Sequence, residues 1–340
     1  MFARRLPIEL YDEITSYLWN DSSSLKACAL ANRVLVAPSQ KRLFYRIALS
    51  QYKFHDADTL RACIGCESLG TPSSFYWLLA HSPHLAEYVQ VLYIIDIDSS
   101  GRSIALDVEL PDIPPVLGNE RDLHFEDYKF MNGEEISDLD HTIRPYREIF
   151  KRWLPKDKFL PLFAPLLSDL KALHIVSTSN WQDLPYRVLF TLLYLMRLPS
   201  LVYLQLLPQY PLAIINMALG ENVKHLALNS YPTNDQLPFR LALEHPPLRP
   251  VYLERFFACR AEFLDRFPPT SRIQISNLRK LVVAAIFADE HAHTQRILQK
   301  LRDTLEDFEF SPADDGKREV FIHFLICLYP SYFSGLEAAF

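Results

Sequence analysis

The sequence predicts an α/β protein in which a small N-terminal helical module precedes a long domain of repeated strands and helices. Three observations indicate this class. Three short amphipathic segments fill about the first fifty residues, a six-residue apolar frame recurs further along the chain, and helix-like segments stand between several of its copies. We expect a three-helix bundle over residues 1–50 and an irregular repeat solenoid over residues 51–340, with a parallel sheet and outer helices.

The first predicted helix lies in LPIELYDEITSYLW. Pro7 suits a first helical turn because its missing N–H is not needed there. Leu10, Ile14, Tyr17 and Leu18 then recur at helical spacing, so they share one face of the helix. This segment therefore predicts an amphipathic helix at the start of the chain.

Two further helices are predicted before residue 50. In NDSSSLKACALANRVL, Asp21 or Ser22 can cap a helix whose apolar face includes Leu25. The third begins near Pro38 and continues through Ile47, with apolar and basic residues on opposite sides. A bundle this small leaves apolar surface over, so it must pack on the rest of the chain or on a partner.

The N-terminal pattern LP.EL...I..YL, followed by L..C.L..R, resembles the F-box family, especially fungal members that continue into leucine-rich repeats. The residues that carry the resemblance are Leu6, Pro7, Glu9, Leu10, Ile14, Leu18, Leu25, Cys28, Leu30 and Arg33. Leu35 stands where family members commonly place a tryptophan.

The resemblance implies that the module binds a Skp-type linker protein, which joins it to a cullin scaffold and a ubiquitin-conjugating enzyme. The linker-binding residues that it implies are Leu6, Pro7, Leu10, Ile14, Leu18, Leu25, Cys28, Leu30 and Leu35. The structural alternative is that these leucines only hold the module to its own domain.

The long C-terminal part repeats the frame L-x-x-L-x-L, with other apolar residues allowed. Copies begin at Val89, Leu170, Leu201, Val223, Leu248, Leu278 and Leu305. From the second copy on they are 22 to 31 residues apart, in or near the range of leucine-rich repeats. Helix-like segments stand between them at residues 185–198, 211–220 and 293–304, and Gly220 is suited to close the second. Stacked units of this kind form a continuous parallel sheet with helices outside.

Strand alternation points the last two apolar positions of each frame inward and the residues just before them to the concave face. We expect a protein substrate to bind there, with aromatic residues as anchors because they bury a large area at little entropic cost. The candidate substrate-binding residues are Tyr93, His174, Tyr203, Gln205, His225, Tyr252 and Lys280. The competing interpretation is that solenoid strands simply need some residue at each such position.

Composition excludes several other functions. The net charge is −6, which gives no attraction for phosphate backbones, so nucleic acid is not an expected partner. The chain has only 8 glycines and lacks the GxGxxG, GxxxxGK[ST] and GxSxG patterns of three large enzyme classes. Residues 107–141 are rich in acidic residues and proline, and we interpret them as an insertion in the repeat, with a basic substrate patch as one conceivable partner.

The five cysteines have no disulfide-like spacing, and the start of the chain lacks an apolar signal region. We therefore expect a cytoplasmic or nuclear location and no membrane partner.

Motifs for metal or redox chemistry are incomplete. Asp96 begins a partial match to a calcium loop, continued by Asp98, Ser100, Gly101 and Asp107, but the flanking helices are missing. The lone C-x-x-C of Cys63 and Cys66 has no second pair of ligands for zinc. His291 and His293 point in different directions on a helix. We predict no metal, no cofactor and no catalytic residues.

Three functions from different classes remain. The first is a non-catalytic substrate receptor of a Skp–cullin–F-box ubiquitin ligase with an unknown protein substrate. The second is a repeat scaffold that binds a partner without any ligase, its helical module serving as a cap. The third, a hydrolase or metal enzyme, is disfavoured because no nucleophile, base and orienting group can be assembled.

Overall fold

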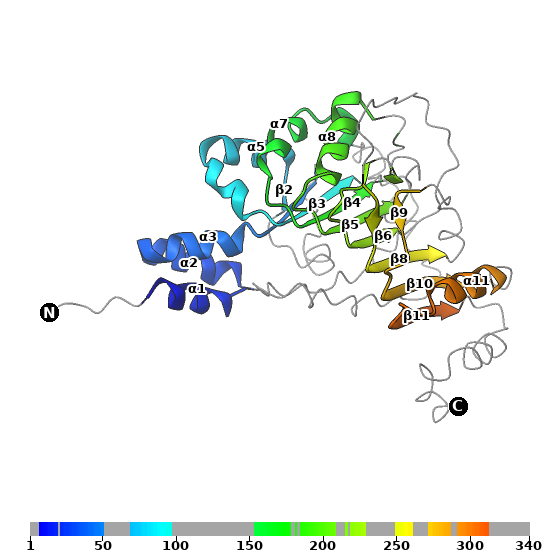
Figure 1. The fold of residues 1–340 in the computed structure, drawn as a ribbon. Coiled ribbons are helices and arrows are strands. Elements are labelled where there is room, and N and C mark those ends of the chain that lie inside the picture. Colours follow the sequence, from blue (N-terminus) through cyan, green and yellow to red (C-terminus); the bar gives the residue numbers. More distant parts are fainter. Residues whose placement is uncertain are drawn as a thin grey trace, which may run out of the picture. The chain divides into compact units, whose positions relative to one another are not determined.

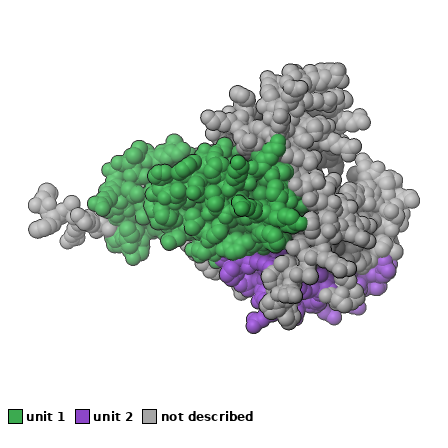
Figure 2. Space-filling model, turned by 90° about the horizontal axis from the view of Figure 1, so that it is seen from above, with its two compact units in different colours: residues 1–195 green, residues 196–340 purple. Residues whose placement is uncertain are grey.

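A computed structural model describes residues 7–19, 21–50, 69–96, 153–177, 181, 184–208, 215–216, 218–228, 249–260, 271–286 and 291–312. The α/β class is confirmed, because helices and a mostly parallel sheet make up this part of the chain. The chain divides into two compact units, residues 1–195 and residues 196–340, coloured green and purple in Figure 2. A boundary at residue 50 stays a prediction, and the acidic stretch 107–141 lies outside the described residues.

The first unit begins with three α-helices: α1 (Ile8–Ser16), α2 (Ser22–Ala31) and α3 (Val36–Leu43), with the 3₁₀ turn η1 (Arg33–Leu35) before the last. Asp21 is the N-cap of α2. Its Oδ1 accepts a hydrogen bond from Ser24 N at 2.9 Å, and bonds from Ser24 and Ser23 lower the pKa of Asp21 to about 2. Asn32 caps η1 in the same way, by accepting from Val34 N at 3.1 Å. Polar caps thus set where α2 and η1 begin, whereas α1 and α3 start without a side-chain cap.

The third helix is shorter than predicted. It ends at Leu43, and the residues around Ile47 form the strand β1 (Arg46–Leu49) instead. The carbonyl of Tyr45 accepts hydrogen bonds from Gln90 N and Val91 N, both at 3.0 Å, so this segment pairs with a distant strand. The helical continuation was wrong because tertiary pairing overrides a short apolar pattern that fits both periods.

The sheet of the first unit is parallel, in the order β2-β1-β3-β4 (Figure 1). Its further strands are β2 (Leu69–Gly70), β3 (Val91–Asp96) and β4 (Ala172–Ser177). Its further helices are α5 (Pro72–His81), η2 (Pro83–Tyr88), η5 (Leu154–Lys156), α7 (Leu160–Phe163), η6 (Ala164–Leu166) and α8 (Tyr186–Met196). Ile47, Leu92 and Leu173 stand in one register row and are fully buried, so apolar rows across the strands form the core.

The second unit has a parallel sheet in the order β5-β6-β8-β10-β11, in which strands adjacent in space follow one another along the chain. Its strands are β5 (Tyr203–Pro208), β6 (His225–Leu228), β8 (Arg255–Arg260), β10 (Lys280–Ile286) and β11 (Asp307–Pro312), and α11 (His291–Leu301) precedes the last. A separate parallel pair joins β7 (Val251–Tyr252) to β9 (Ile273–Gln274).

One backbone contact recurs between neighbouring strands. The carbonyl of the residue just before a strand accepts two successive N–H groups from the next strand in the sheet. Lys224 O, for example, accepts from Glu254 N at 2.8 Å and Arg255 N at 3.1 Å, and Glu254 O accepts from Arg279 N and Lys280 N at 2.8 and 3.1 Å. A carbonyl has two lone pairs and can accept both. The contact fixes the relative register of the strands that it joins.

Six of the seven predicted frames lead into β3, β4, β5, β6, β10 and β11. The frame at Leu248 holds only the short strand β7, which pairs with β9, so the long strand predicted there was wrong. The long strand begins at Arg255 instead, in a frame that starts at Leu253 and continues through Phe256 and Ala258. At Leu248 the third frame position would be Pro250. That position must donate an N–H to the shared carbonyl, and proline has none.

Gly220 lies where the chain passes close to the end of α8. Its N–H donates to Met196 O at 2.9 Å, and a Cβ at this position would come within 3.0 Å of the same carbonyl oxygen. The sequence predicted a glycine that closes a helix, and residues 215, 216 and 218 are helical just before it. Here the lack of a side chain permits the close backbone contact.

Asp96, at the end of β3, is fully buried and holds the chain where the described residues resume at Trp153. Its Oδ1 accepts from Trp153 N at 2.7 Å and Leu154 N at 3.2 Å, and its Oδ2 accepts from Ser177 Oγ at 3.0 Å. The Trp153 indole also donates to Ile95 O at 2.7 Å. This carboxylate therefore joins β3, β4 and the start of η5.

We predict that Asp96→Ala lowers the free energy of unfolding by about 3–4 kcal/mol, because three buried donors lose a charged acceptor. Asp157→Ala is the matched control. Asp157 caps α7 by accepting from Leu160 N at 2.6 Å but is half-buried, so its loss should cost only about 1 kcal/mol. Urea unfolding of both variants measures the difference, and equal losses would contradict a special role for Asp96.

Candidate functional site

The N-terminal helices expose large apolar side chains to solvent. Ile8, Leu10, Ile14, Tyr17 and Leu30 are 58, 39, 46, 82 and 89% exposed. All but Leu30 lie on α1 and in the turn that follows it, and Leu30 lies on α2. Leu10, Ile14 and Tyr17 share one side of the first helix by helical spacing, whereas Ile8 lies on the opposite side. We call Leu10, Ile14, Tyr17 and Leu30 the N-terminal apolar face. Five large apolar residues left in water on so small a module indicate a surface for a partner.

The predicted linker-binding residues differ in how far they are exposed to solvent. Leu10, Ile14, Leu30 and Pro7 are exposed, and Leu18, Cys28 and Leu35 are half-buried. Leu25 is only 1% exposed and belongs to the core, so its predicted place on the surface was wrong. Leu6 lies outside the described residues.

Ile8 and Tyr17 were missing from the predicted set. Helical spacing did place Tyr17 on the apolar side of the first helix, but the family resemblance did not include it among the linker-binding residues.

Charged and aromatic contacts hold the N-terminal helices together and join them to the start of β1. Asp12 on α1 pairs with Arg42 on α3 at 3.5 Å and with Lys41 at 3.7 Å, and Arg42 is almost fully buried. The Trp19 ring meets Tyr45 edge to face at 5.1 Å, where burial raises the pKa of Tyr45. These contacts tie α1 to α3 and to the start of β1 without using the N-terminal apolar face.

Six of the seven predicted substrate-binding residues are buried. They are Tyr93, His174, Tyr203, Gln205, His225 and Lys280, none more than 9% exposed. The expectation that they line an open concave surface was therefore wrong. Alternation does place them opposite the inward apolar rows, but both faces of these strands are buried, as is usual for parallel sheets. Only Tyr252, at 50%, is exposed.

Within the first unit, Tyr93 and His174 stand in register on neighbouring strands. Their rings are stacked with centroids 4.2 Å apart and an interplanar angle of 19°. Each side chain is 1% exposed, so the pair is part of the packing between β3 and β4.

A row of polar residues crosses the second unit at the third frame position. Tyr203, His225, Arg255, Lys280 and Asp307 are paired in register. Burial, with help from the charges of Arg255 and Lys224, lowers the pKa of His225 to about 3. Burial also acts to lower the pKa of Lys280, but hydrogen bonds to Glu309 and Asp307 outweigh it and raise that pKa. His225 is therefore held neutral and Lys280 charged.

We predict that His225 makes the second unit sensitive to acid. Its folded pKa lies below the unfolded value near 6.5, so the unfolded chain binds an extra proton as pH falls and stability is lost below pH 6.5. Between pH 7.5 and 5 this group should cost about 2 kcal/mol of unfolding free energy. Urea titrations at several pH values should show the loss in the parent chain and less of it in His225→Gln.

The exposed His81 provides the control for this experiment. His81→Gln should keep the pH dependence of the parent chain. An unchanged slope in His225→Gln would contradict the assignment.

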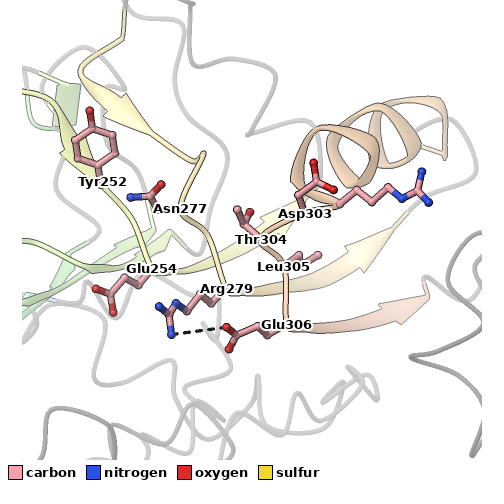
Figure 3. Close-up of a pocket in the computed structure, with 9 residues that line it drawn as sticks. Tyr252, Glu254, Asn277, Arg279, Asp303, Thr304, Leu305 and Glu306 are labelled. Carbon is pink, nitrogen blue, oxygen red and sulfur yellow. Dashed lines mark ion pairs between the residues drawn. The ribbon is translucent and has the colours of Figure 1, made fainter.

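A pocket of about 520 Å³ opens at the amino-terminal ends of the strands of the second unit. It is lined by Tyr252, Glu254, Asn277, Arg279, Arg302, Asp303, Thr304, Leu305 and Glu306. Figure 3 shows Tyr252, Asn277 and Glu254 on one side and Asp303, Thr304 and Leu305 on the other, with the Arg279–Glu306 ion pair between them. Mostly polar and charged, this pocket suits a polar peptide segment better than an apolar ligand.

Charges alternate along the edge of the sheet at the pocket. Lys224, Glu254, Arg279 and Glu306 all occupy the second frame position, directly before their strands. Lys224 pairs with Glu254 at 3.4 Å and Arg279 with Glu306 at 3.6 Å, and all four side chains are more than a third exposed. The shared-carbonyl contact brings these residues into one row, so the row follows from the register of the strands.

Sites for metal or redox chemistry do not assemble among the residues that the structure describes. No three His, Cys, Asp or Glu side chains there come together as metal ligands. Asp96, the first position of the partial calcium loop, has both oxygens occupied by hydrogen bonds, and the other loop positions lie outside the described residues. The same is true of Cys63 and Cys66, so the prediction of no metal stays untested. His291 and His293 form the first turn of α11.

Within the described ranges, no helix is both long enough and apolar enough to cross a membrane.

Comparisons with known proteins leave the family open. No protein-family model, no curated protein and no solved structure matches this chain.

Proposed function

We propose that this protein is an F-box type substrate receptor of a ubiquitin ligase, with an N-terminal three-helix bundle that binds a Skp-type linker protein and a leucine-rich-repeat domain that binds a protein substrate. The observation that carries the proposal is the N-terminal apolar face, in particular Leu10, Ile14 and Leu30. These three residues belong to the pattern that resembles the F-box family, and all three are exposed to solvent. A core interpretation would bury them.

The size of the N-terminal apolar face supports a protein partner. Fully burying a leucine or isoleucine contributes about 1.5–3 kcal/mol, so covering several half-exposed ones yields several kcal/mol before the costs of association. Glu9 and Glu13 lie beside the face on α1 and would form a polar rim.

The repeat domain would supply the second binding surface. The recurring frame and the shared-carbonyl contact support assignment to the leucine-rich class. With most of the sheet face buried, we place substrate contact at the pocket lined by Tyr252, Arg279 and Glu306. An exposed aromatic residue beside arginine is a combination typical of interface anchors.

Catalysis would take place on other subunits. A receptor of this kind brings a substrate lysine close to the charged conjugating enzyme, which replaces a bimolecular encounter with a local one. On this proposal the cullin scaffold is an indirect partner, no cofactor is needed, and the protein works in the cytoplasm or nucleus. The competing function is a scaffold that binds its partner through the repeats alone.

We predict that Leu10→Asp with Ile14→Asp lowers co-purification of a Skp-type linker by at least tenfold, because two carboxylates would have to be desolvated in the interface. Affinity purification with quantitative mass spectrometry measures linker and cullin together. Both positions are exposed, so the fold should persist, as circular dichroism can check.

Gln295→Asp with Gln299→Asp is the matched control for this variant. It adds the same two charges at the same i, i+4 spacing on α11, in the second unit, and should retain the linker. Linker capture that is equal in parent, variant and control would refute the interface. Absence of linker and cullin from the parent purification would favour the scaffold.

We predict that Tyr252→Ala with Arg279→Ala weakens substrate capture by about tenfold while linker capture stays at the parent level, since the pocket and the N-terminal apolar face are separate surfaces. Proximity labelling from the parent and variant chains compares the captured proteins. Gln295→Asp with Gln299→Asp again serves as control. An unchanged set of captured proteins would move the substrate site away from this pocket.

A further inference from the structure

The outer helices of the first unit carry a second apolar surface. Trp77 on α5, Leu162 on α7 and the stripe Tyr186, Phe190 and Tyr194 on α8 are each 43 to 57% exposed. The helices α5 and α7 pack together through Phe75 and Phe163, whose rings meet edge to face at 5.1 Å. Figure 1 shows α5, α7 and α8 on the same face of the parallel strands. We call these five exposed residues the outer aromatic face.

The helix α11 shows what a solvent-facing helix of this protein looks like. It has the same length as α8, 11 residues, and exposes Arg296, Gln299 and Lys300. On its outer side α8 exposes Tyr186, Phe190 and Tyr194, together with Arg187, the one charged residue in its sequence. Both helices bury leucines on their inner side. The difference between their outer sides indicates that α8 faces something other than water.

The outer aromatic face supplies a substantial part of the area that an association needs. An aromatic side chain offers about 150–250 Å², so four that are about half exposed contribute about 400 Å². With the exposed Leu162 this is a little more than half of the roughly 800 Å² per partner of a standard interface. It also reaches the upper range of apolar patches on ordinary monomers.

We infer that two copies of this protein pair through α8, antiparallel about a two-fold axis at Phe190. A two-fold interface must be complementary to itself, since each copy contributes the same patch. Tyr186 and Tyr194 lie four residues on either side of Phe190 and all three are exposed, so the stripe reads the same in both directions. Pairing sets Phe190 against Phe190 and Tyr186 of one copy against Tyr194 of the other.

The charges near the stripe fit this arrangement. Arg187 lies in the first turn of α8, so antiparallel pairing places it level with Leu193, in the last turn of the second copy. The carboxyl end of a helix carries partial negative charge and favours a cation nearby. A parallel arrangement would instead bring the two Arg187 side chains together. A membrane-binding helix would need a basic polar face, which α8 lacks.

The test is the oligomeric state of the full chain, measured by sedimentation equilibrium over a range of concentrations. The parent chain should be a dimer that dissociates on dilution, and Phe190→Asp with Tyr194→Asp should raise its dissociation constant at least a hundredfold. Gln295→Asp with Gln299→Asp should leave the dimer unchanged. Far-UV circular dichroism establishes that each variant is folded. A parent chain that stays monomeric, or a folded Asp variant that still dimerises, would overturn the inference.

Cysteine cross-linking tests the two-fold geometry directly. Phe190→Cys should form a disulfide between copies under mild oxidation, above the background of the parent chain's own cysteines, whereas Gln299→Cys should not. Failure of Phe190→Cys to link would overturn the antiparallel pairing. Two other results would refute the dimer. The parent chain could be monomeric and bind neutral phosphatidylcholine vesicles, or it could be monomeric and bind a different protein through Phe190. Either result would assign the outer aromatic face to another partner.

Discussion

The shared carbonyl before each strand is the contact on which the register of the sheets depends. Tyr45, Gln90, Val202, Lys224, Glu254 and Arg279 each offer a carbonyl oxygen to two N–H groups of the next strand. Because this fixes the offset between neighbours, equivalent frame positions line up across a sheet. Apolar rows such as Leu204, Leu226 and Phe256 then meet in the core, and charged residues gather at one edge. The packing and the candidate pocket both follow from one backbone arrangement.

Much of the fold could be predicted from the sequence, because most of the longer strands carry the apolar frame and α2 follows Asp21, one of its two predicted caps. The strands β1, β2, β8 and β9 could not be found that way, and two of them show why. The segment around Ile47 is short and fits a helical period equally well, so only its pairing with Val91 and Leu92 decides its structure. The strand beginning at Arg255 lies five residues after a better-looking frame, and the missing N–H of Pro250 rules out the earlier one.

The candidate sites, too, could be predicted from the sequence only in part. Helical spacing predicted an apolar face containing Leu10 and Ile14, since an isolated amphipathic helix reveals its two sides in the sequence. It could not show that Tyr203 and His225 would be buried, because alternation tells which face a strand residue is on and not whether that face is covered. The exposed side of α8 could not be predicted either. This helix has apolar residues on all of its sides, so its sequence does not show which side packs against the sheet.

Asp96 gives the protein a place where its length can change. Asp96 and Trp153 are held together although 56 residues separate them in the sequence, because Trp153 N lies 2.7 Å from the Asp96 side chain. The entropy of closing a loop grows only slowly with its length. Residues 97–152 could therefore be replaced by a shorter or longer segment with little loss of folding free energy. The condition is that Asp96, Trp153 and Ser177 keep their hydrogen bonds.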